Sequence, residues 1–424
     1  MYYFRQWKSL FKNWKKDLLA GITVGIVALP LALGFAITTG APASAGLSTA
    51  IVAGFIAALF GGSNFQVSGP TGAMTVVLVP IVARYGVQSL VLLGIAAGSL
   101  IIVMSALRLG RWIDSVPWSV MEGFTLGIAL IIALQQVPLI FDTTKAPGDH
   151  TFLVAINTLR SALSSPLHWA SISIALLTVA IKRSWPLLKS RLGIQAHVPG
   201  SIVAIVSATL ITKIFSLDIK TIGKLPRTLS FTHDYSLPDI SPFHFAYAAL
   251  VIAFLGAIES LLSARVADGM AHKEIDHDQQ KHDPNRELLG QGLATIASAC
   301  AGGLPATGAI ARTTVNVHAG ARSRLAAIFH SLFLLLVVYF LAPIVSIIPT
   351  AALAGVLLGT SLRIATPRSI KEALRTTADV RAVYLCTAVA VLTIDLIWGT
   401  LIGVVLHFLL IKRKKQSQNK FPGN

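Results

Sequence analysis

The sequence has little charge and little cysteine. Only 12% of its 424 residues are charged and 54% are hydrophobic, whereas soluble domains carry about 25% charged residues. The two cysteines, Cys300 and Cys386, both lie in apolar stretches, which excludes a disulfide framework and a cysteine-based metal site. The composition therefore predicts an all-α polytopic membrane protein embedded in a lipid bilayer.

Acidic residues are scarce beside basic ones, with 18 Asp and Glu against 35 Lys and Arg. The net charge of +17 does not indicate a nucleic-acid partner, because the basic residues cluster in short segments between hydrophobic runs. Such clusters are typical of cytoplasmic loops. We therefore expect a multi-pass protein of a cell membrane, and specifically of a bacterial inner membrane. The chain should cross the membrane an even number of times, with both termini in the cytoplasm.

Apolar runs between polar breaks predict about fourteen helical segments. They begin near residues 17, 43, 66, 89, 118, 165, 199, 245, 288, 308, 325, 350, 379 and 396. Several are shorter than the roughly 17–25 residues that cross a bilayer. Short or Gly/Pro-interrupted segments are typical of the discontinuous helices of transporters.

Three polar insertions, 141–164, 217–243 and 266–287, separate these segments. The last contains His272, His277 and His282, whose spacing fits no zinc pattern well. We expect a solvated loop there and no metal site.

The two halves of the chain share a short motif. PTGAMT (70–75) and ATGAIA (306–311) each follow a Gly-Gly pair and open an apolar segment. They fall at the third helix of each seven-helix half, which predicts an inverted repeat. Two half-helices that begin at mid-membrane would aim their positive ends at one point and bind an anion between residues 68–72 and 307–311. Alternatively, the glycines only permit close helix packing.

Arg312 lies in GLPATGAIARTT, between two apolar runs. A helix that starts at Thr307 and Gly308 would put Arg312 on the same face as Gly308, where its guanidinium could offer two parallel donors to an oxyanion. The alternative is a side chain that snorkels toward the lipid headgroups.

Glu259 shares a helical face with Gly256 and Ser263. A buried carboxylate here is suited to carry a proton, and Glu259 with Ser263 could bind H⁺ or Na⁺. The alternative is that Glu259 is only the buried counter-charge of Arg312.

Five stretches carry a resemblance to a known family. They are DLLAGITVGIVALPLALGFA (17–36), GGSNFQVSGPTGAMTVVL (61–78), LGAIESLLSARVADGM (255–270), NRELLGQGLATIASACAGGLPATGAIARTTVNVHAGARS (285–323) and LAPIVSIIPTAALAGVLL (341–358). The chain resembles the transmembrane domain of the SulP anion transporters, called SLC26 in animals.

The resemblance implies 14 transmembrane segments in a 7+7 inverted repeat, the UraA-like/SLC26 fold. Helices 1–4 and 8–11 would form a core domain with half-helices 3 and 10, and helices 5–7 and 12–14 a gate domain. The core would move against the gate as an elevator. The implied order is a cytoplasmic segment (1–16), a first repeat (17–216), an outer loop (217–243), a second repeat (244–411) and a cytoplasmic tail (412–424).

By position, the resemblance points to an anion site formed by the starts of helices 3 and 10 and by helix 1. Its residues would be Leu31, Phe35, Ser68, Gly69, Thr71, Gly72, Thr307, Gly308, Ala309 and Arg312. Two departures affect the expected substrate. Many members have Gln where Leu31 stands, and Tyr-Gly-Leu-Tyr where this chain has AGLS at 45–48.

We expect a secondary active transporter of sulfate, bicarbonate or a dicarboxylate, with no cofactor other than a coupling ion. Only KRKKQSQNKFPGN follows the last helix, so we expect no STAS domain in this sequence, either because the member is naturally short or because the chain was truncated. A homodimer is a further expectation. The alternatives are an uncoupled anion exchanger or channel-like protein, and a nucleobase transporter of the same fold. The sequence shows no nucleophile–base pair or phosphate-binding motif that would indicate an enzyme.

Overall fold

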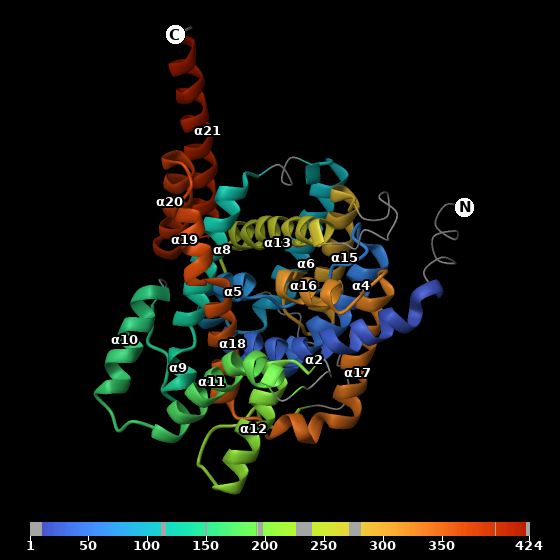
Figure 1. Cartoon of the computed structure of the whole chain (residues 1–424), viewed down its shortest axis with the longest axis vertical. Coiled ribbons are helices and arrows are strands. Elements are labelled where there is room, and N and C mark those ends of the chain that lie inside the picture. Colours follow the sequence, from blue (N-terminus) through green and yellow to red (C-terminus); the bar gives the residue numbers. More distant parts are fainter. Residues whose placement is uncertain are drawn as a thin grey trace.

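The computed structural model describes residues 11–111, 116–148, 151–191, 193, 198–225, 240–270, 281–394 and 396–420. These residues form a bundle of helices (Figure 1). The elements up to residue 214 are η1 (Phe11–Asn13), α2 (Trp14–Thr39), α3 (Ala43–Ser48), the π-helical turn η2 (Thr49–Ala53), α4 (Gly54–Phe60), β1 (Ser68–Gly69), α5 (Gly72–Tyr85), α6 (Ser89–Ala106), α8 (Trp118–Leu134), α9 (Val137–Ile140), α10 (Thr151–Leu163), α11 (Trp169–Arg191) and α12 (Gly200–Ile214). The later elements are α13 (Pro242–Met270), α15 (Pro284–Cys300), β2 (Thr307–Gly308), α16 (Ile310–His318), α17 (Leu325–Ser346), α18 (Thr350–Ile364), α19 (Pro367–Leu374), α20 (Ala378–Thr393) and α21 (Leu396–Lys420).

Most helices begin within a few residues of their predicted starts. Among the described residues, seven helices are long and apolar enough to cross a membrane, and α5, α10, α12 and α18 are shorter apolar helices. The count of fourteen crossings stays a prediction. Within the polar insertion 141–164 the structure adds a helix that was not among the predicted segments: α10 forms because Val154, Ala155, Thr158 and Ala162 place one buried face at helical spacing.

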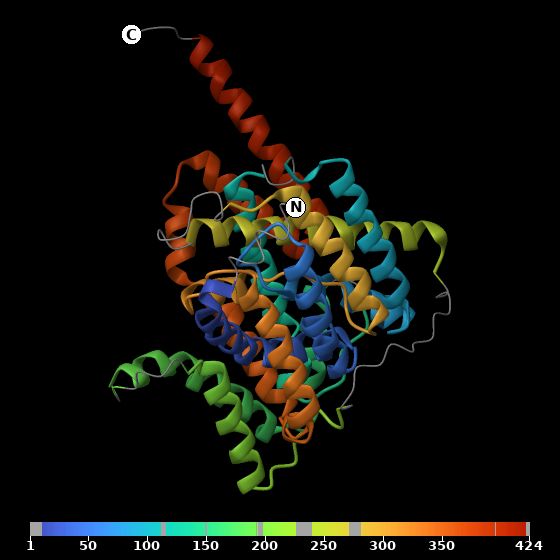
Figure 2. The same cartoon turned by 90° about the vertical axis from the view of Figure 1, so that its right-hand side faces the viewer.

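One group of helices joins the two halves of the chain through close packing. This first group contains α2, α5, α6, α13, α15, α16 and α17. In it α2 packs on α17, α5 and α16, α13 packs on α16 and α6, and α6 packs on α15. Figure 2 shows α6 and α15 side by side. Gly98 of α6 and Gly292 of α15 allow this approach, because a Cβ on either would lie 2.7 Å from the carbonyl oxygen of the other. Small residues at such contacts are typical of helix pairs in membranes.

A second group contains α8, α11 and α12 from the first half and α18, α20 and α21 from the second. Here α8 packs on α20, α11 packs on α12 and α18, and α20 packs on α21. The C-terminal part of α21 projects away from the bundle (Figures 1 and 2). The two groups meet where α18 contacts α2 and where α8 contacts α5.

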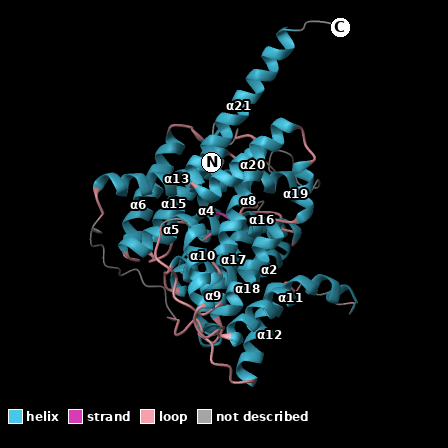
Figure 3. Ribbon diagram, turned by 90° about the vertical axis from the view of Figure 1, so that its left-hand side faces the viewer, coloured by secondary structure: helices cyan, strands magenta, loops and turns pink. Residues whose placement is uncertain are grey.

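The two shared motifs meet at the centre of the bundle. The strands β1 and β2 pair antiparallel, with Ser68 opposite Gly308 and Gly69 opposite Thr307. They lie in the interior among the helices (Figure 3). The backbone N–H of Ala309 extends the pairing by donating to the carbonyl oxygen of Val67 over 3.0 Å. The extended segments that precede α5 and α16 are therefore tied to each other, and buried backbone away from a helix finds its hydrogen bonds there.

Candidate functional site

The helices α5 and α16 both begin inside the bundle, directly after the paired strands. Thr71 is the N-cap of α5, and its Oγ1 accepts a hydrogen bond from the N–H of Met74 at 3.3 Å. The N-cap of α16 is Ala309, whose side chain cannot cap. The first N–H groups of an α-helix have no partner within that helix, and they concentrate positive charge at its start.

The start of α16 differs from the prediction by a few residues. The helix begins at Ile310, while Gly308 lies in β2. The prediction that Gly308 and Arg312 share a helical face is therefore wrong, because strand pairing with Ser68 keeps Gly308 extended.

A cavity of about 100 Å³ lies against both helix starts. Its walls come from α2, α5, α8, α13, α16 and α18. The lining residues that the sequence predicted are Leu31, Phe35, Thr71, Gly72, Glu259, Ala309 and Arg312. One water molecule takes about 30 Å³ in the liquid, so the cavity suits a few waters or one compact anion.

Arg312 places its guanidinium at this cavity and inside the protein. Its side chain is among the largest that are fully buried, with 1% of the residue exposed, so the snorkelling alternative is wrong. Nη2 donates to the carbonyl oxygen of Pro70 over 2.9 Å. Nη1 is buried and has no hydrogen-bond partner among the described residues. An unpaired donor on a buried cation is costly, and an anion in the cavity would supply its acceptor.

Gly69 makes room for that guanidinium. A Cβ at position 69 would overlap Nη1 of Arg312. The glycine just before the first motif is thus required by the arginine just after the second.

Glu259 receives one hydroxyl from each half of the chain. Thr71 and Thr307 each donate from Oγ1 to Oε2 of Glu259 over 2.7 Å. Among the ion pairs of the described part of the chain, none joins Glu259 to Arg312. Glu259 therefore does not form the direct ion pair with Arg312 that a counter-charge would form. The two threonine hydroxyls stabilise its carboxylate instead.

The predicted face of α13 does pack against the second motif. Oγ of Ser263 lies 2.9 Å from Oγ1 of Thr313, and Oγ of Ser260 accepts a hydrogen bond from the N–H of Gly308 at 3.0 Å. Ser263 therefore lies beside α16, one turn along from Glu259.

Ser68 points away from the cavity. Its hydroxyl donates to Oε1 of Gln291 over 2.9 Å, and Nε2 of Gln291 donates to the carbonyl oxygen of Ala306 over 2.8 Å. These hydrogen bonds attach the segments of β1 and β2 to α15.

The sequence did not predict the residues of the second helix group that line the cavity. Thr125 of α8 and Thr360 of α18 line the cavity with hydroxyl groups, and no break or charge marks either of them in the sequence. Lys182 also approaches this wall, since its Nζ donates to Oγ1 of Thr360 over 2.6 Å and to the carbonyl oxygen of Val356 over 2.7 Å. The basic segment 182–191 forms the end of helix α11.

The histidine-containing loop lies largely outside the described residues, including His272 and His277. His282 is described, and its Nδ1 lies 2.7 Å from Oδ2 of Asp268. Within the described ranges no group of three or more His, Cys, Asp or Glu side chains could hold a metal ion.

Two half-helices that begin at paired strands inside a bundle of apolar helices, with a cavity against both of their starts, are typical of multi-pass membrane transporters. The model of the sulfate permease family, the SulP family, matches residues 14–387. The chain belongs to this family.

Two curated relatives illustrate the match. YvdB of Bacillus subtilis, named for a proposed sulfate transport activity, is 33% identical over 95% of this chain and 74% of its own length. The bicarbonate transporter BicA of Picosynechococcus is 30% identical over 97% of this chain and 73% of its own length.

Solved structures show the same fold. The transmembrane domain of a cyanobacterial bicarbonate transporter BicA matches with a TM-score of 0.79 and 28% identity, over 94% of this chain and 98% of that one. A murine Solute Carrier 26 family member A9 anion transporter in the inward-facing state matches with a TM-score of 0.80 over 94% of this chain and 68% of that one. Its identity is 17%, so it supports the fold alone. The UraA-like/SLC26 fold that the sequence predicted is confirmed.

Proposed function

We propose that this protein is a secondary active transporter of a compact oxyanion, which binds between the starts of α5 and α16. The family and its relatives are anion transporters and not enzymes. The observation that carries the proposal is the free Nη1 of Arg312 at a cavity against two helix starts. A guanidinium and two helix N-termini together offer the donors and the positive charge that an oxyanion needs.

The volume of the cavity bears on the substrate. About 100 Å³ suits bicarbonate or sulfate better than a longer dicarboxylate. The relatives named for sulfate and bicarbonate transport support these two candidates. The side chains of Leu31 and Phe35 offer no hydrogen-bond donor. In this proposal, the donors that recognise the oxyanion therefore come from α5 and α16.

Coupling is assigned to Glu259. Oε2 accepts from Thr71 and Thr307, which leaves Oε1 to take a proton or to join the hydroxyls as a ligand of Na⁺. Carboxylate and hydroxyl oxygens are the ligands that hard cations prefer. Loading this site neutralises a negative charge beside the anion cavity and thereby favours anion binding there.

The two helix groups suggest the movement. The paired strands tie α5 to α16 within the first group, while α8 and α18 of the second group supply the facing wall. In the proposed elevator cycle, the first group carries the anion past the second. Both termini would face the cytoplasm, and assembly as a homodimer is part of the same proposal.

Uptake of radiolabelled sulfate and, separately, of radiolabelled bicarbonate into proteoliposomes tests the function, with unlabelled sulfate, bicarbonate, fumarate, chloride and uracil as competitors. We expect competition by bicarbonate and sulfate, and accumulation only under an inward H⁺ or Na⁺ gradient. Exchange without any gradient dependence would instead support the uncoupled exchanger. Uracil as the strongest competitor would favour the nucleobase transporter, and the absence of any tracer uptake would contradict transport of these anions.

A further inference from the structure

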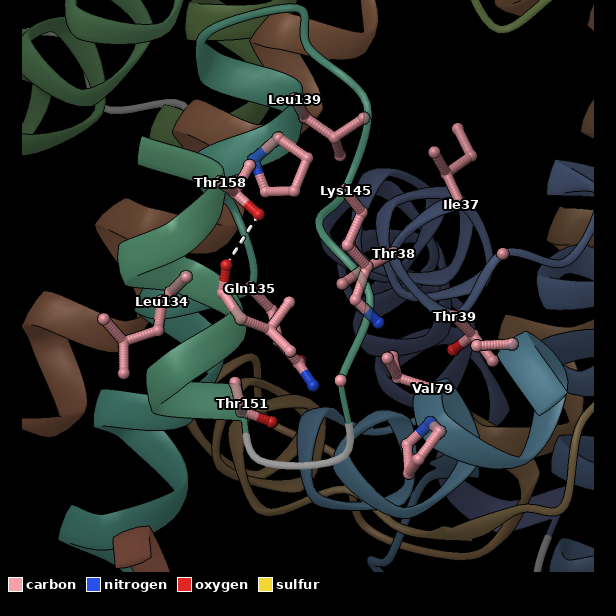
Figure 4. A pocket seen from close by; sticks show the side chains of 17 residues that line it. Ile37, Thr38, Thr39, Val79, Leu134, Gln135, Leu139, Lys145, Thr151 and Thr158 are labelled. Carbon is pink, nitrogen blue, oxygen red and sulfur yellow. Dashed lines mark hydrogen bonds between the residues drawn. The ribbon is translucent and has the colours of Figure 1, made fainter. Parts of the chain in front are cut away.

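A second and larger cavity lies apart from the proposed substrate site. Its volume is about 230 Å³. It is enclosed by the C-terminal ends of α2, α5 and α8, by α9 and α10, and by the loop that precedes α10 (Figure 4). Figure 1 shows α2 running from the side of the N-terminus toward α9 and α10, so this cavity lies at the far end of α2. Neither the anion proposal nor the coupling proposal uses it.

The first unusual feature of this cavity is Gln135, at the end of α8. The residue is only 9% exposed. Its side-chain Nε2 and Oε1 are both buried, and neither has a hydrogen-bond partner among the described residues. Since buried polar groups in folded proteins are nearly always paired, this amide lacks a partner that a molecule in the cavity would provide.

The second feature is Lys145, whose side chain reaches into the same space (Figure 4). The loop that carries it is fixed at two points. The N–H of Ala146 donates to Oγ1 of Thr158 over 3.0 Å, and Asp142 accepts an ion pair from Lys220 at 2.8 Å. No carboxylate in the described ranges pairs with Lys145. A positioned ammonium group therefore lies at the mouth of the cavity.

The remaining wall is largely aliphatic. The apolar lining residues are Ile37, Val79, Pro80, Ala83, Leu134, Pro138, Leu139, Val154 and Ala155. Ligand sites combine such walls with a few polar groups that orient the ligand. An inorganic anion would lose its hydration against these side chains without gaining enough donors, whereas a carboxylate on an apolar body would satisfy both parts of the cavity.

We propose that this cavity binds a compact organic monocarboxylate, whose carboxylate contacts Lys145 and Gln135 and whose apolar body packs against the aliphatic wall. The walls come from α2 and α5 of the first helix group and from α8 of the second. A bound molecule therefore contacts both groups, and it resists any movement of one past the other. On the proposed orientation it enters from the outer face of the membrane.

Isothermal titration calorimetry of the purified protein with benzoate tests this site. Benzyl alcohol is the neutral control of similar shape. We expect benzoate to bind, and Lys145→Met and Gln135→Met each to weaken binding by about tenfold or more, the effect of losing one charge-assisted hydrogen bond. Gln135→Met removes two unpaired polar atoms without creating a space, so the variant should fold. Lys213→Met, a lysine exposed on α12, is the matched control and should leave the affinity unchanged.

Ala83→Leu distinguishes the two cavities. Ala83 lines the second cavity and is exposed, so a leucine there narrows the space without overpacking the interior. We expect it to abolish benzoate binding. Binding that survives Ala83→Leu and is competed by bicarbonate would place benzoate in the α5–α16 cavity and overturn the proposal. No heat with benzoate, or equal affinity for benzyl alcohol, would overturn it as well. None of these results depends on transport, so they leave the proposed function to its own test.

Discussion

The guanidinium of Arg312 donates to the backbone carbonyl oxygen of Pro70 over 2.9 Å. The arginine that follows the second TGA motif thus holds the chain just before the first. One donor stabilises the junction of the two halves, and the other, Nη1, stays unpaired at the cavity. One side chain is therefore expected to have both a structural role and an anion-binding role.

Replacing Arg312 tests the anion site. We expect Arg312→Ala to abolish anion binding, and Arg312→Lys to retain part of it, because lysine keeps the charge but lacks the planar fork. Calorimetry with sulfate and bicarbonate measures both. Loss of the bond to Pro70 should also cost about 1–3 kcal/mol of stability, which thermal unfolding of the same samples would show. Wild-type affinity in the alanine variant would contradict the assignment.

Replacing Glu259 by glutamine tests coupling. Glutamine keeps an oxygen that can accept from Thr71 and Thr307, so the protein should fold, but it cannot carry a proton or a full negative charge. We expect Glu259→Gln to lose accumulation driven by an H⁺ or Na⁺ gradient in proteoliposomes and to retain exchange of labelled for unlabelled anion. Unchanged dependence on the gradient would rule out the coupling role.

The two threonines that contact Glu259 should act as equivalents. Thr71→Val and Thr307→Val each remove one donor and keep the shape of the side chain. We expect each to shift the coupling-ion dependence of uptake, with the double variant shifting it further. Thr75→Val is the matched control, because Oγ1 of Thr75 donates to the carbonyl oxygen of Thr71 and not to the carboxylate. Equal behaviour of control and test variants would mean that the hydroxyls only fill space.

Glu287 provides a test of stability without a role in transport. Its Oε2 accepts from the N–H groups of Gly62 and Ser63 at 2.9 and 3.0 Å, and the residue is 2% exposed. Glu287→Ala would leave the buried N–H of Ser63 unpaired, at about 1–3 kcal/mol, and would also remove the acceptor of the half-buried Gly62 N–H. We expect a lower unfolding temperature, with Glu287→Gln less affected because it keeps one acceptor. An unchanged unfolding temperature for the alanine variant would show that water replaces the carboxylate.

The broad architecture and the candidate residues of the site could be predicted from the sequence, because apolar runs, glycine–proline breaks and an arginine in apolar surroundings are all local signals. The role of these residues in anion binding stays a prediction. The meeting of the two motifs followed from their equivalent places in the two halves. The start of α16 at Ile310 could not be read in this way, since the pairing of Gly308 with Ser68 is a long-range contact. The same holds for Thr125 and Thr360, which only the packing of α8 and α18 brings to the cavity.

The ladder between β1 and β2 also has a thermodynamic consequence. Because Gly69 pairs with Thr307, the residues proposed to hold the anion and those proposed to hold the coupling ion belong to one hydrogen-bonded unit. Linkage between two such sites is reciprocal: the factor by which the ion tightens anion binding equals the factor by which the anion tightens ion binding. A substitution that breaks the ladder should therefore reduce both factors together and by the same amount.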